Sequence, residues 1–213
     1  MERLQRNAGT AGIVSAVLLL LLFFLIASTG VNLMAPGDPA QALAAFTQKA
    51  GSWMPIGLVG ALASAVAAIF LAGLSSRLHD KAPTRSRAVL YFGLIGLSAH
   101  ALGSLILWLG GANLAAFAAK DQTAAIPAWI AMTSVLAGFS GAGNGFSGAS
   151  AAIAGWAIIQ TGAMKAVVGW VALAAGVFNI LAVFAPGAMP VLLLSFLLAI
   201  VWLAWGGIVL RAG

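Results

Sequence analysis

The sequence predicts an all-α integral membrane protein, a polytopic bundle of six transmembrane helices in one domain over residues 1–213. The 213 residues are 62% hydrophobic and only 7% charged, whereas a soluble domain carries roughly 25% charged residues. The chain also contains six apolar stretches that reach the length of about 20 residues needed to cross a bilayer. The six spans are predicted at about 9–29, 53–76, 88–110, 139–162, 166–185 and 188–210.

The first span begins after two arginines and resembles the start of a secretory signal peptide. Arg3 and Arg6 precede a stretch that carries no charge between residues 9 and 29. We expect this stretch to be retained as span one rather than cleaved.

Short helices are expected outside the membrane after spans one and three. Asp38 and Pro39 have the residue types of a helix N-cap and of a first helical position. Residues 110–111, both glycine, are expected to close span three, and a second short helix is expected over 113–121. Residues 127–138 form either a third short helix or an extension of span four.

The positive charges predict the orientation of the bundle. Only Lys49 and Lys120 fall at the end of the spans away from the termini, whereas eight of the ten lysines and arginines fall at the other end: Arg3, Arg6, Arg77, Lys81, Arg85, Arg87, Lys165 and Arg211. Because cytoplasmic loops are enriched in lysine and arginine, both termini are predicted to be cytoplasmic.

We expect a multi-pass protein of a bacterial cytoplasmic (inner) membrane, with the lipid bilayer as its main partner. The basic loop over 77–87 is expected to touch anionic headgroups. Nucleic acid is not an expected partner, because the positive charge is spread over the connections between spans. Aromatic side chains are expected at both membrane–water interfaces, among them Tyr91 and Trp170 at the inner one and Trp53 and Trp129 at the outer one.

A seam of small residues marks the fourth span. The unit Gly-Phe-Ser-Gly-Ala occurs at 138–142 and again at 145–149. Its register, alternately three and four residues apart, predicts one helix-contact face made of Gly138, Gly141, Gly145, Gly148, Ala152 and Gly155. Three hypotheses fit this face: packing within the bundle, contact with another subunit or a second copy, and close approach of a lipid, quinone or pigment.

Four polar residues are predicted to share a layer near the middle of the membrane: Ser64, His100, Ser147 and Asn179. A buried imidazole needs hydrogen-bond partners, and serine or asparagine on neighbouring helices can supply them. His100 is therefore a structural histidine, an axial ligand to a haem or to the magnesium of a chlorophyll-type pigment, or part of a polar substrate pathway. No other metal ligand is predicted.

The sequence offers little enzyme chemistry. It contains no cysteine, which excludes disulfides and thiolate sites, and it places no Asp, Glu, Lys or Arg inside a predicted span, which argues against a proton relay. We expect a non-enzymatic protein without catalytic residues, which serves as a helix-packing or accessory subunit of a membrane assembly or as a homo-oligomer. The alternatives are a carrier or pore for a neutral or apolar solute and a pigment- or haem-binding subunit; no cofactor is required by the sequence.

One stretch carries a resemblance to a known family. It runs from Gly155-Trp156 to Ala182 and includes Val168-Gly169-Trp170. With its six spans, the chain resembles an uncharacterised bacterial family of six-span membrane proteins, catalogued as a domain of unknown function. That family usually has Pro-Arg before the Gly-Trp, where this chain has Met164-Lys165. The resemblance implies a helix bundle in a bacterial membrane and assigns no activity or functional residue.

Overall fold

A computed structural model describes residues 2–31, 37–185 and 188–212. Within these residues the chain is all-helical, with 92% helix and no strand. Six helices are long and apolar enough to cross a membrane: α1 (Glu2–Thr29), α3 (Ala50–His79), α4 with its continuation (Pro83–Ala118), α6 (Gln122–Thr161), α7 (Ala166–Phe184) and α8 (Met189–Ala212). The predicted fold class, an all-α membrane bundle of six spans, is confirmed at this level.

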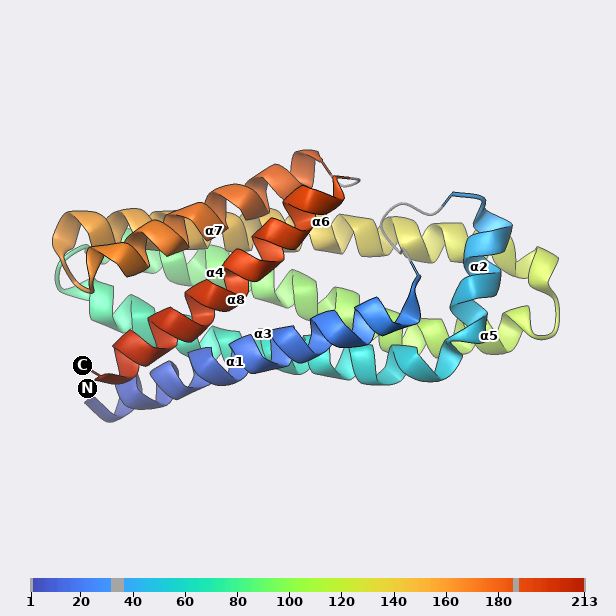
Figure 1. Ribbon diagram of the computed structural model, residues 1–213, viewed down its shortest axis with the longest axis horizontal. Helices are drawn as coiled ribbons and strands as arrows, with labels where there is room; N and C mark the ends of the chain where they lie inside the picture. Colours follow the sequence, from blue (N-terminus) through green and yellow to red (C-terminus); the bar gives the residue numbers. More distant parts are fainter. Residues whose placement is uncertain (1, 32–36, 186–187, 213) are drawn as a thin grey trace.

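The six long helices form a closed ring in which each helix packs on the next along the chain. The contacts run from α1 through α3, α4, α6, α7 and α8, and α8 packs back on α1. Successive helices run in opposite directions, so both termini lie at one end of the bundle (Figure 1). The short helix α2 (Pro39–Gln48) and the helix α5 (Gly111–Ala118) lie at the other end.

The fourth span is one uninterrupted helix. Residues 127–138 extend it rather than forming a helix of their own, and α6 has 40 residues. At 1.5 Å per residue it is about 60 Å long, roughly twice the ~30 Å thickness of a hydrocarbon core. Asp121 begins the helix by accepting a hydrogen bond from the Ala124 nitrogen at 3.0 Å, so α6 starts seventeen residues before the predicted span, residues 122 against 139.

The prediction that residues 110–111 close span three is wrong. The helix α4 (Pro83–Leu105) continues through a five-residue π-helix, η1 (Ile106–Gly110), directly into α5. Gly111 is buried, and a Cβ there would lie 3.0 Å from the ring of Phe46. Gly111 therefore allows α2 to pack closely against the continuous helix made of α4, η1 and α5, and it does not break that helix.

The polar segment 77–87, predicted to be a loop, is mostly helical. The helix α3 continues to His79 and α4 begins at Pro83, so only residues 80–82 connect them. Proline is favourable at the first helical position because its missing N–H has no partner there in any case.

A further correction concerns the aromatic residues that were predicted at the outer interface. Trp53 and Trp129 are buried rather than exposed at an interface, with 1% of each side chain accessible. Trp53 stacks on Phe46 of α2 with ring centroids 4.5 Å apart, and Trp129 packs on the same ring at a tilt of 48° with centroids 4.8 Å apart. The Trp53 indole donates to the Phe46 carbonyl at 2.9 Å. Because α2, begun as predicted by Asp38 and Pro39, covers this end of the bundle, the indoles find their partners inside the protein.

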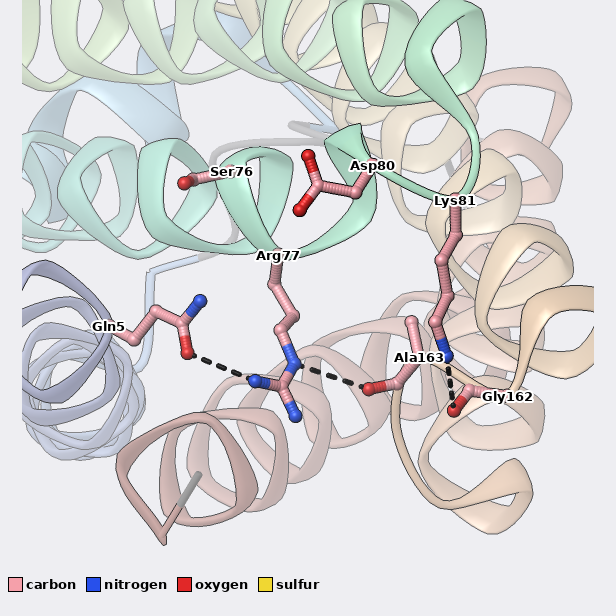
Figure 2. A pocket seen from close by; sticks show the side chains of 7 residues that line it. All are labelled: Gln5, Ser76, Arg77, Asp80, Lys81, Gly162 and Ala163. Atoms are coloured by element: carbon pink, nitrogen blue, oxygen red, sulfur yellow. Dashed lines mark hydrogen bonds between the residues drawn. The ribbon is translucent and has the colours of Figure 1, made fainter. Parts of the chain in front are cut away.

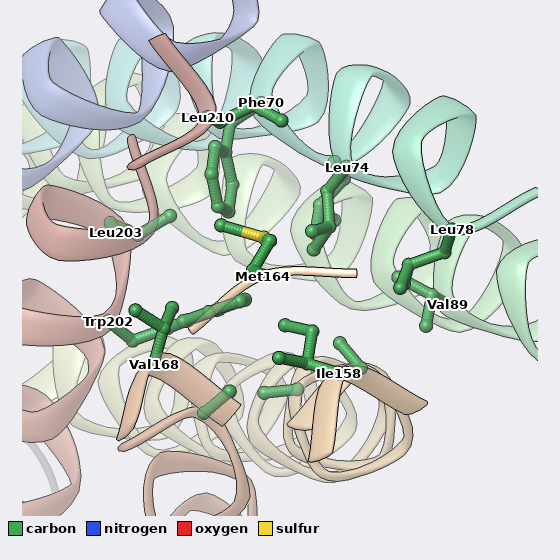
Figure 3. Close-up of a cluster of buried hydrophobic side chains, with 14 of the residues drawn as sticks. Phe70, Leu74, Leu78, Val89, Ile158, Met164, Val168, Trp202, Leu203 and Leu210 are labelled. Atoms are coloured by element: carbon green, nitrogen blue, oxygen red, sulfur yellow. The ribbon is translucent and has the colours of Figure 1, made fainter. Parts of the chain in front are cut away.

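A larger apolar core closes the ring at the end that carries the termini. It joins buried side chains from α3, α6, α7 and α8 and from the α6–α7 turn, among them Phe70, Leu74, Ile158, Met164 and Trp202 (Figure 3). Phe70 and Trp202 pack edge to face, with centroids 5.5 Å apart. This core leaves the interior of the ring filled near the charged end.

Candidate functional site

The helix α6 packs against α7 with one face and against α4 with another, and small residues shape both contacts. Several of the close approaches of α6 to α4 and α7 involve a glycine on one of the two helices, among them Gly96, Gly143, Gly148, Gly155 and Gly176. In a membrane, such close approach supplies the van der Waals contacts and short interhelical distances that hold helices together.

The inner half of the seam packs backbone to backbone on α7. A Cβ added to Gly155 would lie 2.5 Å from the Leu173 nitrogen, and one added to Gly148 would lie 2.8 Å from the Gly176 carbonyl oxygen. The reverse also holds, since a Cβ on Gly176 would lie 2.5 Å from the Gly148 carbonyl oxygen and equally close to Ala152. Any side chain at these glycines would push α6 and α7 apart.

The other half of the seam, called its outer half because it lies at the end of the bundle away from the termini, has no such neighbour among the described residues. In the described part of the structure, no atom lies within 4 Å of a Cβ built on Gly138 or Gly141, and a Cβ on Gly145 meets only the tip of Val183 at 3.7 Å. The reason is length, because α7 ends at Phe184 while α6 continues outward. The seam predicted from the sequence is therefore covered over about half of its extent.

His100 belongs to α4 and packs against a second face of α6. Its imidazole rests on Gly143, where a Cβ would lie 2.6 Å from the ring. In return, Ser147 rests on Gly96, whose Cβ would lie 2.5 Å from the Ser147 nitrogen. Each helix thus supplies a glycine for the polar side chain of the other, and on each helix the glycine and the polar residue are four positions apart.

The four residues of the predicted polar layer do not form a hydrogen-bonded network among the described residues. Ser64 donates to the Gly60 carbonyl of its own helix at 3.0 Å, and the Asn179 amide donates to Ala175 at 2.8 Å. The Ser147 hydroxyl is buried without a partner in the described structure. Asn179 instead lies beside the seam, with its Cβ 3.0 Å from the Cβ position of Gly148.

Interhelical hydroxyl bonds that were not anticipated from the sequence occur elsewhere in the ring. Ser75 and Ser86 join α3 to α4 through two bonds, each hydroxyl donating to the carbonyl of the other residue, at 3.0 and 2.7 Å. Ser150 of α6 donates to the Val89 carbonyl of α4 at 2.7 Å. A serine inside an apolar span was the available signal, but its partner is a backbone carbonyl that no sequence pattern identifies.

No family model, curated protein or solved structure matches this chain. The resemblance to a six-span family therefore stays a prediction, and the site has to be interpreted from its own geometry. Among the described residues, no group of three or more His, Cys, Asp or Glu side chains is placed to hold a metal ion.

Two hollows lie at opposite ends of the bundle. One is at the end with the termini, between the ends of α1 and α3 and the turn that joins α6 to α7. The other lies between α5 and the start of α6, beside Asn113 and Met132. Neither is lined by His100 or Asn179.

Proposed function

We propose that this protein is a non-enzymatic, multi-pass protein of a bacterial cytoplasmic membrane and that it works as an accessory subunit of a membrane assembly or as a homo-oligomer. The observation that carries the proposal is the half-covered seam of α6. Gly148 and Gly155 pack on the backbone of α7, whereas Gly138 and Gly141 offer the same kind of surface with no atom of the described residues within 4 Å of their Cβ positions.

Physical chemistry favours a helix as the object that covers this outer half. Apolar side chains gain little by leaving lipid, so helices associate in membranes through close packing and interhelical hydrogen bonds. A glycine surface allows the close packing. Asn144 is half-buried beside Gly145 and makes no hydrogen bond to the described residues, so its amide provides a donor and an acceptor for an interhelical hydrogen bond.

The experiment that tests the proposal is the native mass of the protein in mild detergent or nanodiscs. We expect a mass above that of one 21.4 kDa chain. Gly141→Leu should shift this mass to the single chain without loss of helix, because the larger side chain blocks the contact without meeting α7. Ala142→Leu, on the neighbouring exposed position, is the matched control and should keep the assembly. A monomeric wild type, or an assembly unaffected by Gly141→Leu, would count against the proposal.

We further propose that the end with the termini faces the cytoplasm and that α2 and α5 lie outside. Eight of the ten basic residues at one end support this orientation, in accordance with the positive-inside tendency. Because the chain has no cysteine, single-cysteine variants give a clean measurement. On intact cells, a membrane-impermeant maleimide should label Gln122→Cys, and it should label Thr84→Cys only after lysis. The opposite pattern would invert the topology.

A further inference from the structure

At the end with the termini, the helices α4 and α6 are joined by a pair of polar side chains. The Arg85 guanidinium, in the first turn of α4, donates from Nη1 to the side-chain oxygen of Gln160, in the last turn of α6. Arg85 is half-buried and Gln160 is exposed, so the pair lies at the surface of the bundle. Arg85 makes no other hydrogen bond and no ion pair with the described residues, which leaves most of its N–H donors available.

The neighbouring cation, Lys81, serves a different purpose. It donates to the carbonyls of Thr161 and Gly162 at 3.3 and 3.5 Å, and Figure 2 shows the second of these bonds. The C-terminus of a helix carries about half a negative elementary charge, which favours a cation at this position. Lys81 therefore balances the end of α6, whereas the partner of Arg85 is a neutral amide that leaves the charge of the guanidinium uncompensated.

The Arg85–Gln160 pair is placed at the level of lipid headgroups. It joins the ends of two helices that are long and apolar enough to cross a membrane. Trp156 lies one turn deeper on the same face of α6 as Gln160, and 46% of its side chain is exposed. Tryptophan is enriched at membrane–water interfaces, where its apolar ring faces lipid and its N–H meets polar groups.

Deeper along the same edge of the α4–α6 contact, the surface is aromatic. Phe92 follows Arg85 by seven positions and therefore shares its helix face. It stacks on Phe146 of α6 with ring centroids 6.0 Å apart, and both rings remain more than a third exposed, at 37% and 38%. Phe92 lies about 10 Å from Arg85 along the helix at 1.5 Å per residue. A molecule that contacts both residues needs a polar head and an apolar chain.

We propose that this edge of the α4–α6 contact binds one anionic phospholipid, in the leaflet on the side of the termini. The phosphate lies against Arg85, whose planar fork matches phosphate oxygens and which Gln160 holds in place. The first part of an acyl chain lies over Phe92 and Phe146. An anionic lipid is favoured over a zwitterionic one because the charge of Arg85 is uncompensated. The site does not rest on the proposed function, and it narrows the predicted contact of segment 77–87 with headgroups to a single arginine.

The test is the thermal unfolding of the detergent-purified full chain, followed by tryptophan fluorescence, as phosphatidylglycerol is added at constant ionic strength. A ligand that binds only the folded state raises the midpoint in a saturable way, and we expect phosphatidylglycerol to do so at lower concentration than phosphatidylcholine. Arg85→Gln should weaken the apparent affinity for phosphatidylglycerol at least about tenfold, which corresponds to about 1.4 kcal/mol. Gln160→Glu should weaken it as well, because a carboxylate beside Arg85 compensates its charge.

Arg87→Gln is the matched control, since it removes the same charge from an exposed position of the same helix. Residues two positions apart do not face each other on a helix, so this variant should keep the affinity within about twofold. Equal losses in Arg85→Gln and Arg87→Gln would reduce the effect to general surface charge and overturn the proposal. So would the absence of a saturable shift, or an Arg85-dependent shift that inorganic phosphate produces at the same concentration, because the apolar part of the lipid would then contribute nothing.

Discussion

Adding a single methyl group to α6 tests how closely α6 and α7 pack. In Gly155→Ala, the new Cβ would lie 2.5 Å from the Leu173 nitrogen, whereas ordinary van der Waals contact begins at 3.4 Å. The obstacle is backbone, which cannot rotate away as a side chain does. The two helices must therefore separate by about 1 Å, and a gap of this size forfeits roughly a quarter to a half of the dispersion energy of each neighbouring atom pair.

The expected magnitude follows from two opposing terms. Overpacking of a filled site costs about 1–3 kcal/mol, while replacing glycine by alanine gains up to about 1 kcal/mol of helix propensity in water. Gly155→Ala should therefore lower the free energy of unfolding by up to about 2 kcal/mol, the difference of these terms. Gly138→Ala is the matched control on the same helix, because no atom of the described part of the chain lies within 4 Å of its Cβ position, and it should leave the protein unchanged or stabilise it.

The assay is unfolding in rising SDS, with tryptophan fluorescence as the probe, in a detergent that keeps the chain monomeric. The result is read from the sign of the difference in unfolding midpoint between Gly155→Ala and Gly138→Ala, since both variants add the same methyl group to the same helix. Equal midpoints, or a Gly155→Ala variant more stable than Gly138→Ala, would refute the backbone-to-backbone contact between α6 and α7.

Two further substitutions test contacts of α4. Gly143→Ala should destabilise the protein by about 1 kcal/mol, because the methyl group displaces the His100 ring. In a His100→Ala background the same change should be neutral or stabilising; a double-mutant cycle measured by SDS unfolding isolates the pair, and no coupling would contradict the contact. Ser75→Ala should cost about 1 kcal/mol through the lost bond to the Ser86 carbonyl, whereas Ser28→Ala, an exposed hydroxyl bonded within its own helix, should have little effect; similar losses in both would argue against the α3–α4 bond.

Local sequence patterns predicted one helix boundary in the first half of the chain correctly and another incorrectly. The residue types at Asp38 and Pro39 predicted the start of α2, and the helix begins there, because capping depends on atoms within a few residues. The same local reasoning failed at residues 110–111, where two glycines continue the helix. In the folded protein Gly111 lies against the ring of Phe46, a contact between residues more than sixty positions apart that local patterns do not reveal.

The candidate site was likewise predictable only in part. The periodic glycines of the fourth span predicted a face of close contact, since three- and four-residue spacing places residues on one side of a helix. Which object meets each glycine was not predictable, because it depends on the different lengths of α6 and α7. The pairing of His100 with Gly143 likewise depends on the register in which α4 crosses α6, and no property of either segment alone sets that register.

By itself, the sequence determined that this protein is a six-span, all-helical membrane bundle with most of its positive charge at one end. The physical reason is that lipid acts as a solvent, and it demands length, apolarity and internally bonded backbone from each segment separately. Only the tertiary structure decided that α8 returns to α1, that half of the glycine seam is covered by α7, and that Arg77 and Lys81 donate to backbone carbonyls at and just after the end of α6. These features depend on where helices end and cross, and they arise only when all six are packed together.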